Sequence, residues 1–291
     1  MRRPRIAYLA LAFAALLFGS TFVVVKEAIA DLPPLGFVGW RFVLGTATLL
    51  LFGIPRGRAL WRDGLIAGLL LFGGYATQTV GLAHTTASNS GLITGLYVVL
   101  TPLLAAAVAR RAPRLLVTLG AVLAFAGLAL LTFDGGFSLH QGDLLTVACA
   151  VSYAGHIVYL ARVASRHRVI PFTAVQLAVV AVGGLATSAA FEGLRLPPSG
   201  VWPALLLTGV AVSAGAFFLQ VWSQTIVGPS RTAIILALEP AFAAAVAAVV
   251  LGERLTAAGW VGAALILAGI YVALAVEEDP LPTAEALTAA H

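Results

Sequence analysis

Four ionisable residues fall within or at the ends of long apolar stretches, where a charge or a proton could serve binding or coupling. They are Lys26, Arg41, His156 and Glu239. An ionisable side chain in hydrocarbon is costly, so each is a candidate functional group. Glu239 precedes Pro240, which cannot donate a backbone hydrogen bond and tends to bend a helix. This pair could therefore hold a carboxylate for a cation, a proton or a substrate amine.

Each of these residues also has a structural interpretation. Arg41 could extend to the membrane interface and pair with a carboxylate such as Asp31. Lys26 could anchor a helix end, and His156 could form a hydrogen bond between two helices. Glu239 could be a buried carboxylate that only shapes its helix. The sequence leaves both interpretations open, and we expect the ion-pair or coupling roles, if present, to belong to these residues.

Uncharged polar and aromatic side chains recur within the same apolar stretches. Ser152, His156 and Tyr159 have helical spacing, so they share one face of a helix. Such groups either join helices or line a wet cavity, and their number favours a mostly apolar cavity with a few orienting groups. The predicted substrate-binding residues are Ser20, Tyr75, Gln78, Asn89, Thr94, Tyr97, Tyr153, His156, Tyr159, Phe217, Gln220, Gln224 and Glu239.

The motifs of catalysis and energy coupling are missing from the sequence. It has no GxxxxGK[ST] phosphate loop, no HExxH and no GxSxG, and Lys26 is its only lysine. The single cysteine, Cys149, excludes a disulfide or thiolate cluster. We therefore predict no catalytic residue, no metal, no cofactor and no enzyme activity. A membrane enzyme acting on a lipid would need an acid, a base, a nucleophile or a metal.

The stretches that carry these residues have the length and composition of membrane spans. Apolar residues make up 60% of the 291-residue chain and charged residues 10%, whereas soluble domains carry about 25% charged residues. A helix needs roughly 20 residues to cross the hydrocarbon core. The pattern predicts an all-α integral membrane protein with ten transmembrane helices, at Ile6–Val25, Leu35–Ile54, Gly64–Ala83, Leu92–Ala109, Leu115–Phe133, Gly142–Leu160, Ile170–Phe191, Val201–Ser223, Thr232–Leu251 and Ala257–Val276.

Arginines gather at alternate gaps between these spans, which orients the chain because cytoplasmic loops are enriched in Lys and Arg. The arginine-rich ends hold Arg2, Arg3, Arg5, Arg56, Arg58, Arg62, Arg110, Arg111, Arg114, Arg162, Arg166, Arg168 and Arg231. We expect a multi-pass protein of the inner (plasma) membrane with both termini cytoplasmic. The net charge is +5, but the basic residues lie in short loops and form no patch interleaved with exposed aromatic residues. This argues against nucleic acid as a partner.

The loop Asp134–Gln141 divides the predicted spans five and five. We expect one repeat at residues 1–136, a second at 142–276 and a short cytoplasmic tail at 277–291. An odd number of crossings inverts the second copy, and inverted repeats around a midplane site are a recurrent transporter design. Shared composition of Gly- and Ala-rich helices is the alternative explanation.

Matched small residues favour a true repeat. Two glycines of the fifth span match two of the tenth at a constant offset along the chain, and these are Gly120, Gly127, Gly262 and Gly269. The fourth span of each half also contains a proline, Pro102 and Pro240, although aligning them needs a small shift.

Four segments carry a family resemblance over nearly the whole chain. They read FGSTFVVVKEAI at Phe18–Ile29, PPLGFVGWRF at Pro33–Phe42, TASNSGLITGLYVVLTPLLA at Thr86–Ala105, and GPSRTAIILALEPAFAAAVAAVVLGERLTAAGWVGAALILAG at Gly228–Gly269. The chain resembles a ten-helix, EamA-type permease of the drug/metabolite transporter superfamily. One departure is Phe18, where many relatives carry tryptophan.

The resemblance implies a secondary transporter that exports small organic metabolites such as amino acids or drug-like compounds. It implies alternating access and a cavity enclosed by the first, third, fourth, sixth, eighth and ninth spans. The expected partners are a small-molecule substrate and the lipid bilayer, and the oligomeric state is not predicted. A membrane enzyme acting on lipid and a structural or sensory subunit without transport are the alternatives.

Overall fold

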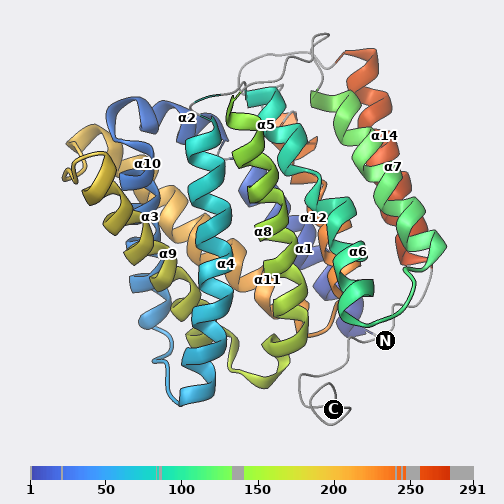
Figure 1. Ribbon diagram of the computed structural model, residues 1–291, viewed down its shortest axis with the longest axis horizontal. Coiled ribbons are helices and arrows are strands. Elements are labelled where there is room, and N and C mark those ends of the chain that lie inside the picture. The colour runs from blue at the N-terminus through green and yellow to red at the C-terminus, as the bar shows by residue number, and fades with distance from the viewer. Residues whose placement is uncertain are drawn as a thin grey trace.

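The computed structural model describes residues 2–20, 22–82, 84, 87–132, 141–239, 241–243, 245–246 and 256–275. Among these residues all regular structure is helical (Figure 1). Helices suit a lipid environment because hydrocarbon offers the backbone no hydrogen-bond partner. The elements are α1 (Arg2–Ser20), α2 (Phe22–Asp31), α3 (Pro34–Leu50), α4 (Arg58–Leu82), α5 (Ala87–Thr94), α6 (Tyr97–Val108), α7 (Leu115–Thr132), α8 (Gln141–Val163), η1 (Ala164–Arg166), α9 (Val169–Phe191), η2 (Ser199–Val201), α10 (Trp202–Leu206), η3 (Leu207–Ala216), α11 (Phe217–Gln224), α12 (Pro229–Leu236) and α14 (Ala257–Leu274).

Several of these helices are long and apolar enough to cross a membrane. In the described part of the chain, six segments meet both criteria, at Arg58–Gly81, Ser90–Val108, Gly142–Arg166, Val169–Phe191, Ser199–Gln224 and Ala257–Leu274. Shorter apolar helices cover Pro4–Ser20, Pro34–Leu50 and Leu115–Leu130. The prediction of an all-helical membrane protein is therefore confirmed.

Several predicted spans have different ends in the structure. The first is divided between α1 and α2, and the ninth begins with α12, which ends at Leu236. Helix α3 ends at Leu50 rather than Ile54, and the residue before Pro55 is disfavoured in a helix. The fourth span starts at Ala87 and is divided, because α5 ends at Thr94 and α6 starts at Tyr97. Three predicted features lie outside the described residues. They are positions 134–140 of the predicted loop, Pro240, and the tail at 277–291.

The surface of the bundle is strongly apolar. Large hydrophobic side chains on several helices are mostly exposed, among them Leu9, Phe13, Val182, Leu267 and Tyr271. A soluble protein rarely exposes so many large apolar side chains together. This surface fits contact with lipid tails.

The matched glycines of α7 and α14 face one another. These two helices lie side by side in Figure 1. A Cβ atom on Gly120 would lie 2.7 Å from the Gly269 carbonyl oxygen, and one on Gly127 would overlap the Gly262 carbonyl oxygen. The first glycine of each helix thus faces the second of the other. Such a self-complementary contact is what a two-fold relation between two helices produces.

Glycines also bring α9 close to α3 and α4. A Cβ atom on Gly184 of α9 would lie 2.8 Å from the backbone nitrogen of Gly39 on α3. On α4, a Cβ atom at Gly68 would lie 2.6 Å from the Cβ atom of Val179. Small residues allow this approach, which is the main source of helix packing in lipid.

Between α10 and α11 the chain forms a π-helix, η3, over Leu207–Ala216. π-Helical segments are rare and are frequent at functional sites. The backbone of η3 packs closely on α3, since a Cβ atom on Gly209 would lie 2.8 Å from the Arg41 carbonyl oxygen. A Cβ atom on Gly45 would likewise lie 2.8 Å from that of Ser213. This contact fixes Ser213 next to α3.

The contact between α7 and α14 makes a prediction about stability. Gly127→Val should destabilise the protein by about 1–3 kcal/mol, because the added side chain overpacks a backbone contact. The measurement is the midpoint of thermal unfolding of the purified protein in detergent. Gly155→Ala on α8 is the control, because a Cβ atom there would meet Leu70 at an ordinary 3.5 Å. Equal midpoints for the two variants would contradict the prediction.

Candidate functional site

Five aromatic rings meet in the middle of the bundle. Tyr75 lies edge-on to Phe42 at 4.8 Å and to Tyr153 at 5.8 Å between ring centroids. Phe217 lies 6.2 Å from Tyr75 and 5.1 Å from Phe18. Aromatic pairs at these distances attract through their ring edges and faces. We call these five residues the aromatic cluster.

The aromatic cluster draws on five helices. Its members come from α1, α3, α4, α8 and α11, so residues far apart in the sequence meet here. Gly74 makes one of these contacts feasible, because a Cβ atom there would overlap the ring of Tyr153. The cluster therefore depends on close packing of α4 against α8.

A polar network borders the aromatic cluster. The Tyr153 hydroxyl donates to Gln78 Oε1 at 3.3 Å, and Gln78 Nε2 donates to Thr94 Oγ1 at 3.3 Å. The Thr94 hydroxyl lies 4.0 Å from the Cys149 sulfur. These contacts join α4, α5 and α8. The sequence predicted Gln78, Thr94 and Tyr153 as site residues, and the structure brings them together.

Arg41 lies against the same cluster. Its side chain is buried, with 6% of the residue exposed. Nε donates to Ser213 Oγ at 2.9 Å, and the guanidinium carbon lies 5.5 Å from the Phe42 ring centroid and 5.6 Å from that of Tyr75. Cation–π contacts of this kind stabilise a cation near an aromatic face. The side chain thus points into the bundle and not towards Asp31.

Glu239 is the acidic residue of the site. It interacts electrostatically with Arg41, Tyr75 and Tyr97. Its backbone lies against α1, because a Cβ atom on Gly19 would overlap the Glu239 carbonyl oxygen. Glu239 and Arg41 are therefore opposite charges of one site.

Several residues of the site are not fully buried. Tyr75, Gln78, Tyr153 and Glu239 are partly exposed although they lie on helices of the bundle. Partly exposed aromatic and polar groups can contact a bound molecule. An aromatic and polar lining with one cation and one carboxylate suits a small organic molecule.

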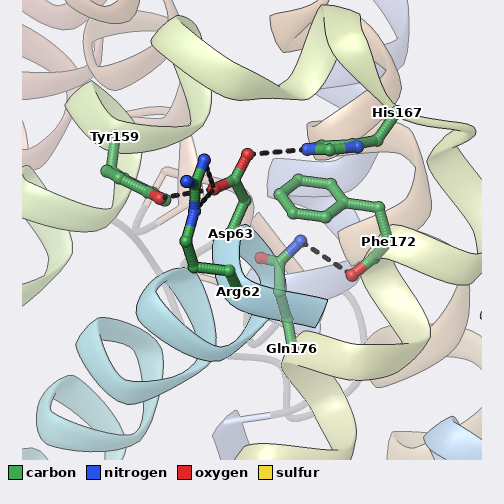
Figure 2. A network of polar contacts seen from close by, with 6 residues as sticks. All are labelled: Arg62, Asp63, Tyr159, His167, Phe172 and Gln176. Carbon is green, nitrogen blue, oxygen red and sulfur yellow. Dashed lines mark hydrogen bonds and ion pairs between the residues drawn. The ribbon is translucent and has the colours of Figure 1, made fainter. Parts of the chain in front are cut away.

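A second polar group lies at the end of the bundle where α4 begins (Figure 2). Asp63 is buried, and its carboxylate accepts from His167 Nε2 at 2.8 Å and from Arg62 Nη2 at 2.9 Å. The Tyr159 hydroxyl lies 3.4 Å from the same carboxylate. The His167 ring packs 4.9 Å from the ring of Phe172. We call Arg62, Asp63, Tyr159 and His167 the Asp63 network.

Three further predicted site residues form contacts between helices or within one helix. His156 is buried, and its Nε2 lies 2.9 Å from Gln176 Oε1 on α9. Gln224 donates to the Ile157 carbonyl oxygen at 2.8 Å and accepts from Gln220 at 3.4 Å. Such hydrogen bonds join neighbouring helices in lipid. The hydrogen-bond partners of these three residues are thus not members of the aromatic cluster.

The remaining predicted residues divide as follows. Tyr97 is buried within electrostatic range of Glu239. The Ser20 hydroxyl donates to the Leu17 carbonyl oxygen of its own helix at 3.1 Å. The side chains of Lys26 and Asn89 lie outside the described part of the structure.

Sequence reasoning missed several residues of both groups. Phe42 and Ser213 looked like ordinary span residues, and only their contacts with Arg41 mark them. Asp63 and His167 lie about a hundred residues apart in separate segments, so no local pattern connects them. Among the described residues, no group of three or more His, Cys, Asp or Glu could hold a metal ion.

One groove of about 220 Å³ lies between α6, α7 and α12. Its lining consists mainly of alanines and prolines, together with Arg111 and Arg114. None of its lining residues belongs to the aromatic cluster. We therefore assign the candidate site to the cluster and not to this groove.

Known proteins resemble this chain over almost its whole length. An "Uncharacterized transporter" of Archaeoglobus fulgidus is 34% identical over 271 residues, which cover 91% of this chain and 85% of the relative. The "Uncharacterized transporter YvbV" of Bacillus subtilis is 28% identical, with 90% and 89% covered. A solved crystal structure matches with a TM-score of 0.80 and 23% identity over 92% of this chain and 96% of that one, so the fold is shared.

The family comparison agrees with these relatives. The model of the EamA-like transporter family matches residues 5–133 and again residues 140–275. The two matches together cover nearly all of the helical chain, and the relatives are named as transporters. The protein is thus a multi-pass membrane transporter and not an enzyme, and it belongs to the EamA-like transporter family, as the sequence motifs predicted.

Proposed function

We propose that this transporter moves small organic metabolites, such as amino acids or drug-like compounds, out of the cell by alternating access. The observation that carries the proposal is the site around the aromatic cluster. Tyr75 and Arg41 come from the first family match, and Tyr153, Phe217 and Glu239 come from the second. A site shared between two halves can face either side of the membrane when the halves move against one another.

We propose that the chain forms ten spans in two inverted repeats, at 1–136 and 142–276. The reciprocal contacts of Gly120 with Gly269 and of Gly127 with Gly262 support this arrangement. They relate α7 and α14 as an in-plane two-fold axis would. The two separate matches to the family model support the same division.

The proposed location is the inner membrane, with both termini and the tail at 277–291 on the cytoplasmic side. The connections from α3 to α4, α6 to α7 and α8 to α9 gather at the lower end of the bundle in Figure 1. They include Arg56, Arg110 and Arg166. Loops rich in arginine favour the cytoplasmic side.

On this orientation, the Asp63 network lies at the cytoplasmic end and holds that end closed. Asp63 joins the start of α4 to His167, in the turn between α8 and α9. A buried hydrogen bond to a carboxylate can hold two elements in one packing arrangement. If transport is coupled to protons, Glu239 is the better candidate, because His156 is hydrogen-bonded between helices away from the cluster.

The transport proposal predicts that substrate exchange is lost when residues of the site are replaced. Tyr75→Ala and Glu239→Gln should each lower counterflow in proteoliposomes by about tenfold or more, the change that 1.4 kcal/mol of binding produces. The measurement uses a panel of labelled amino acids and metabolites. Tyr271→Ala is the matched control, because Tyr271 on α14 is 78% exposed.

Three results would contradict the transport proposal. The first is unchanged counterflow in Tyr75→Ala relative to Tyr271→Ala. The second is chemical turnover of lipid without counterflow of any compound, which would favour a membrane enzyme. The third is failure of every compound to exchange although the protein is folded, which would favour a structural or sensory subunit.

We predict that disrupting the Asp63 network loosens the turn between α8 and α9. Asp63→Asn should destabilise the protein by about 2 kcal/mol, because it removes the buried carboxylate that accepts hydrogen bonds from His167 and Arg62. Amide hydrogen exchange should also become faster over Ala164–Phe172. Arg62→Gln is the control, since the Arg62 side chain is 69% exposed and should matter little. Wild-type exchange over this segment in Asp63→Asn would contradict a closing role.

A further inference from the structure

Arg41 is a buried cation that forms no direct ion pair within the described residues. Only 6% of the residue is exposed, and it lies in α3 among apolar helices. Its side chain bonds the Ser213 hydroxyl, and Glu239 acts on it electrostatically. A buried charge that lacks a direct ion pair is costly. An ionisable residue kept at such a cost within a membrane is a candidate for a role in binding.

The guanidinium is held in a fixed orientation. The Ser213 hydroxyl oxygen accepts a hydrogen bond from Arg41 Nε. The ring centroids of Phe42 and Tyr75 lie 5.5 and 5.6 Å from the guanidinium carbon. A guanidinium has five N–H donors. Arg41 uses one of them on Ser213 and also hydrogen-bonds the Tyr75 side chain. The remaining terminal N–H donors can bind a carboxylate or sulfonate with charge-assisted hydrogen bonds. These donors lie beside the aromatic cluster.

Glu239 limits the charge of the occupant. It interacts electrostatically with Arg41 but forms no ion pair with it in the described structure. A doubly charged anion such as phosphate would have one cation as its partner, and its second charge would be repelled by the nearby carboxylate. A singly charged oxyanion needs only the Arg41 guanidinium as its partner. The adjoining aromatic rings favour an apolar or aromatic body on the same molecule.

We propose that Arg41 is the anion-binding residue of the transport site, and that the substrate carries a single carboxylate or sulfonate attached to an apolar or aromatic body. Ser213 acts as the positioning residue for the guanidinium. The inference rests on the proposed transport function, because it names the substrate class of the same site.

The test compares probes of one shape and different charge. Benzenesulfonate is anionic, benzenesulfonamide is neutral and benzyltrimethylammonium is cationic. Their dissociation constants are measured by calorimetric titration of the purified full-length protein in detergent. We expect wild-type protein to bind benzenesulfonate at least tenfold more tightly than the other two probes, and we expect the preference to weaken at high salt.

Variants separate charge from position and from folding. Arg41→Gln should abolish the preference for benzenesulfonate, and Arg41→Lys should retain part of it, because lysine keeps the charge but lacks the planar fork. Ser213→Ala should weaken benzenesulfonate binding and leave benzenesulfonamide unchanged. Arg56→Gln is the control for loss of one positive charge, since Arg56 is exposed in the loop before α4. If Arg41→Gln does not fold, the binding results for Arg41→Lys and Ser213→Ala still test the proposed anion site.

The outcomes distinguish this inference from the transport proposal. If wild-type protein does not prefer benzenesulfonate, including the case in which no probe binds, the anion site is wrong. The same holds if Arg41→Gln keeps the preference. If the preference depends on Arg41 but neither benzenesulfonate nor any metabolite exchanges in proteoliposomes, the anion site stands and transport fails. If benzenesulfonamide exchanges as fast as benzenesulfonate in both wild type and Arg41→Gln, transport stands and the anion site fails.

Discussion

The close approach of helix backbones at glycine is the interaction on which this structure depends. Lipid tails are as apolar as leucine, so helices in a membrane associate through tight packing and not through exclusion of water. Glycine contacts also position the site. Gly74 admits the Tyr153 ring, Gly45 brings Ser213 to α3, and Gly19 lies against the Glu239 backbone. The glycines that allow tight packing thus contact the residues that we propose bind substrate.

Polar side chains in the described bundle serve two different purposes. His156 with Gln176, and Gln224 with the Ile157 carbonyl oxygen, satisfy one another between helices and leave little capacity for a ligand. Within the described part of the chain, Arg41 and Glu239 interact electrostatically without forming an ion pair, beside aromatic rings that are partly exposed. The two kinds differ in whether their polar groups are already paired with one another. Only the second kind can change partner when a substrate arrives, which is what a carrier requires.

Much of the fold could be predicted from the sequence, because hydrocarbon imposes helix and length together. The positions of most spans and the matched glycines of the fifth and tenth spans followed from pattern alone. The site was harder to predict. Helical periodicity grouped Ser152, His156 and Tyr159 on one face, yet His156 bonds to α9 and Tyr159 points to Asp63. Periodicity gives the face of a helix, and only the packing of several helices decides which neighbour that face meets.

The central claim is that the site around Tyr153 opens alternately to the two sides of the membrane. Cys149, the only cysteine, lies on α8 beside this site and is fully buried. Its reaction with a membrane-impermeant maleimide in oriented proteoliposomes therefore tests the claim without any substitution. The account predicts that Cys149 reacts from either side, and that a transported substrate changes both rates, lowering one as it raises the other. Reaction from one side only, or rates that no exchanged compound alters, would contradict it.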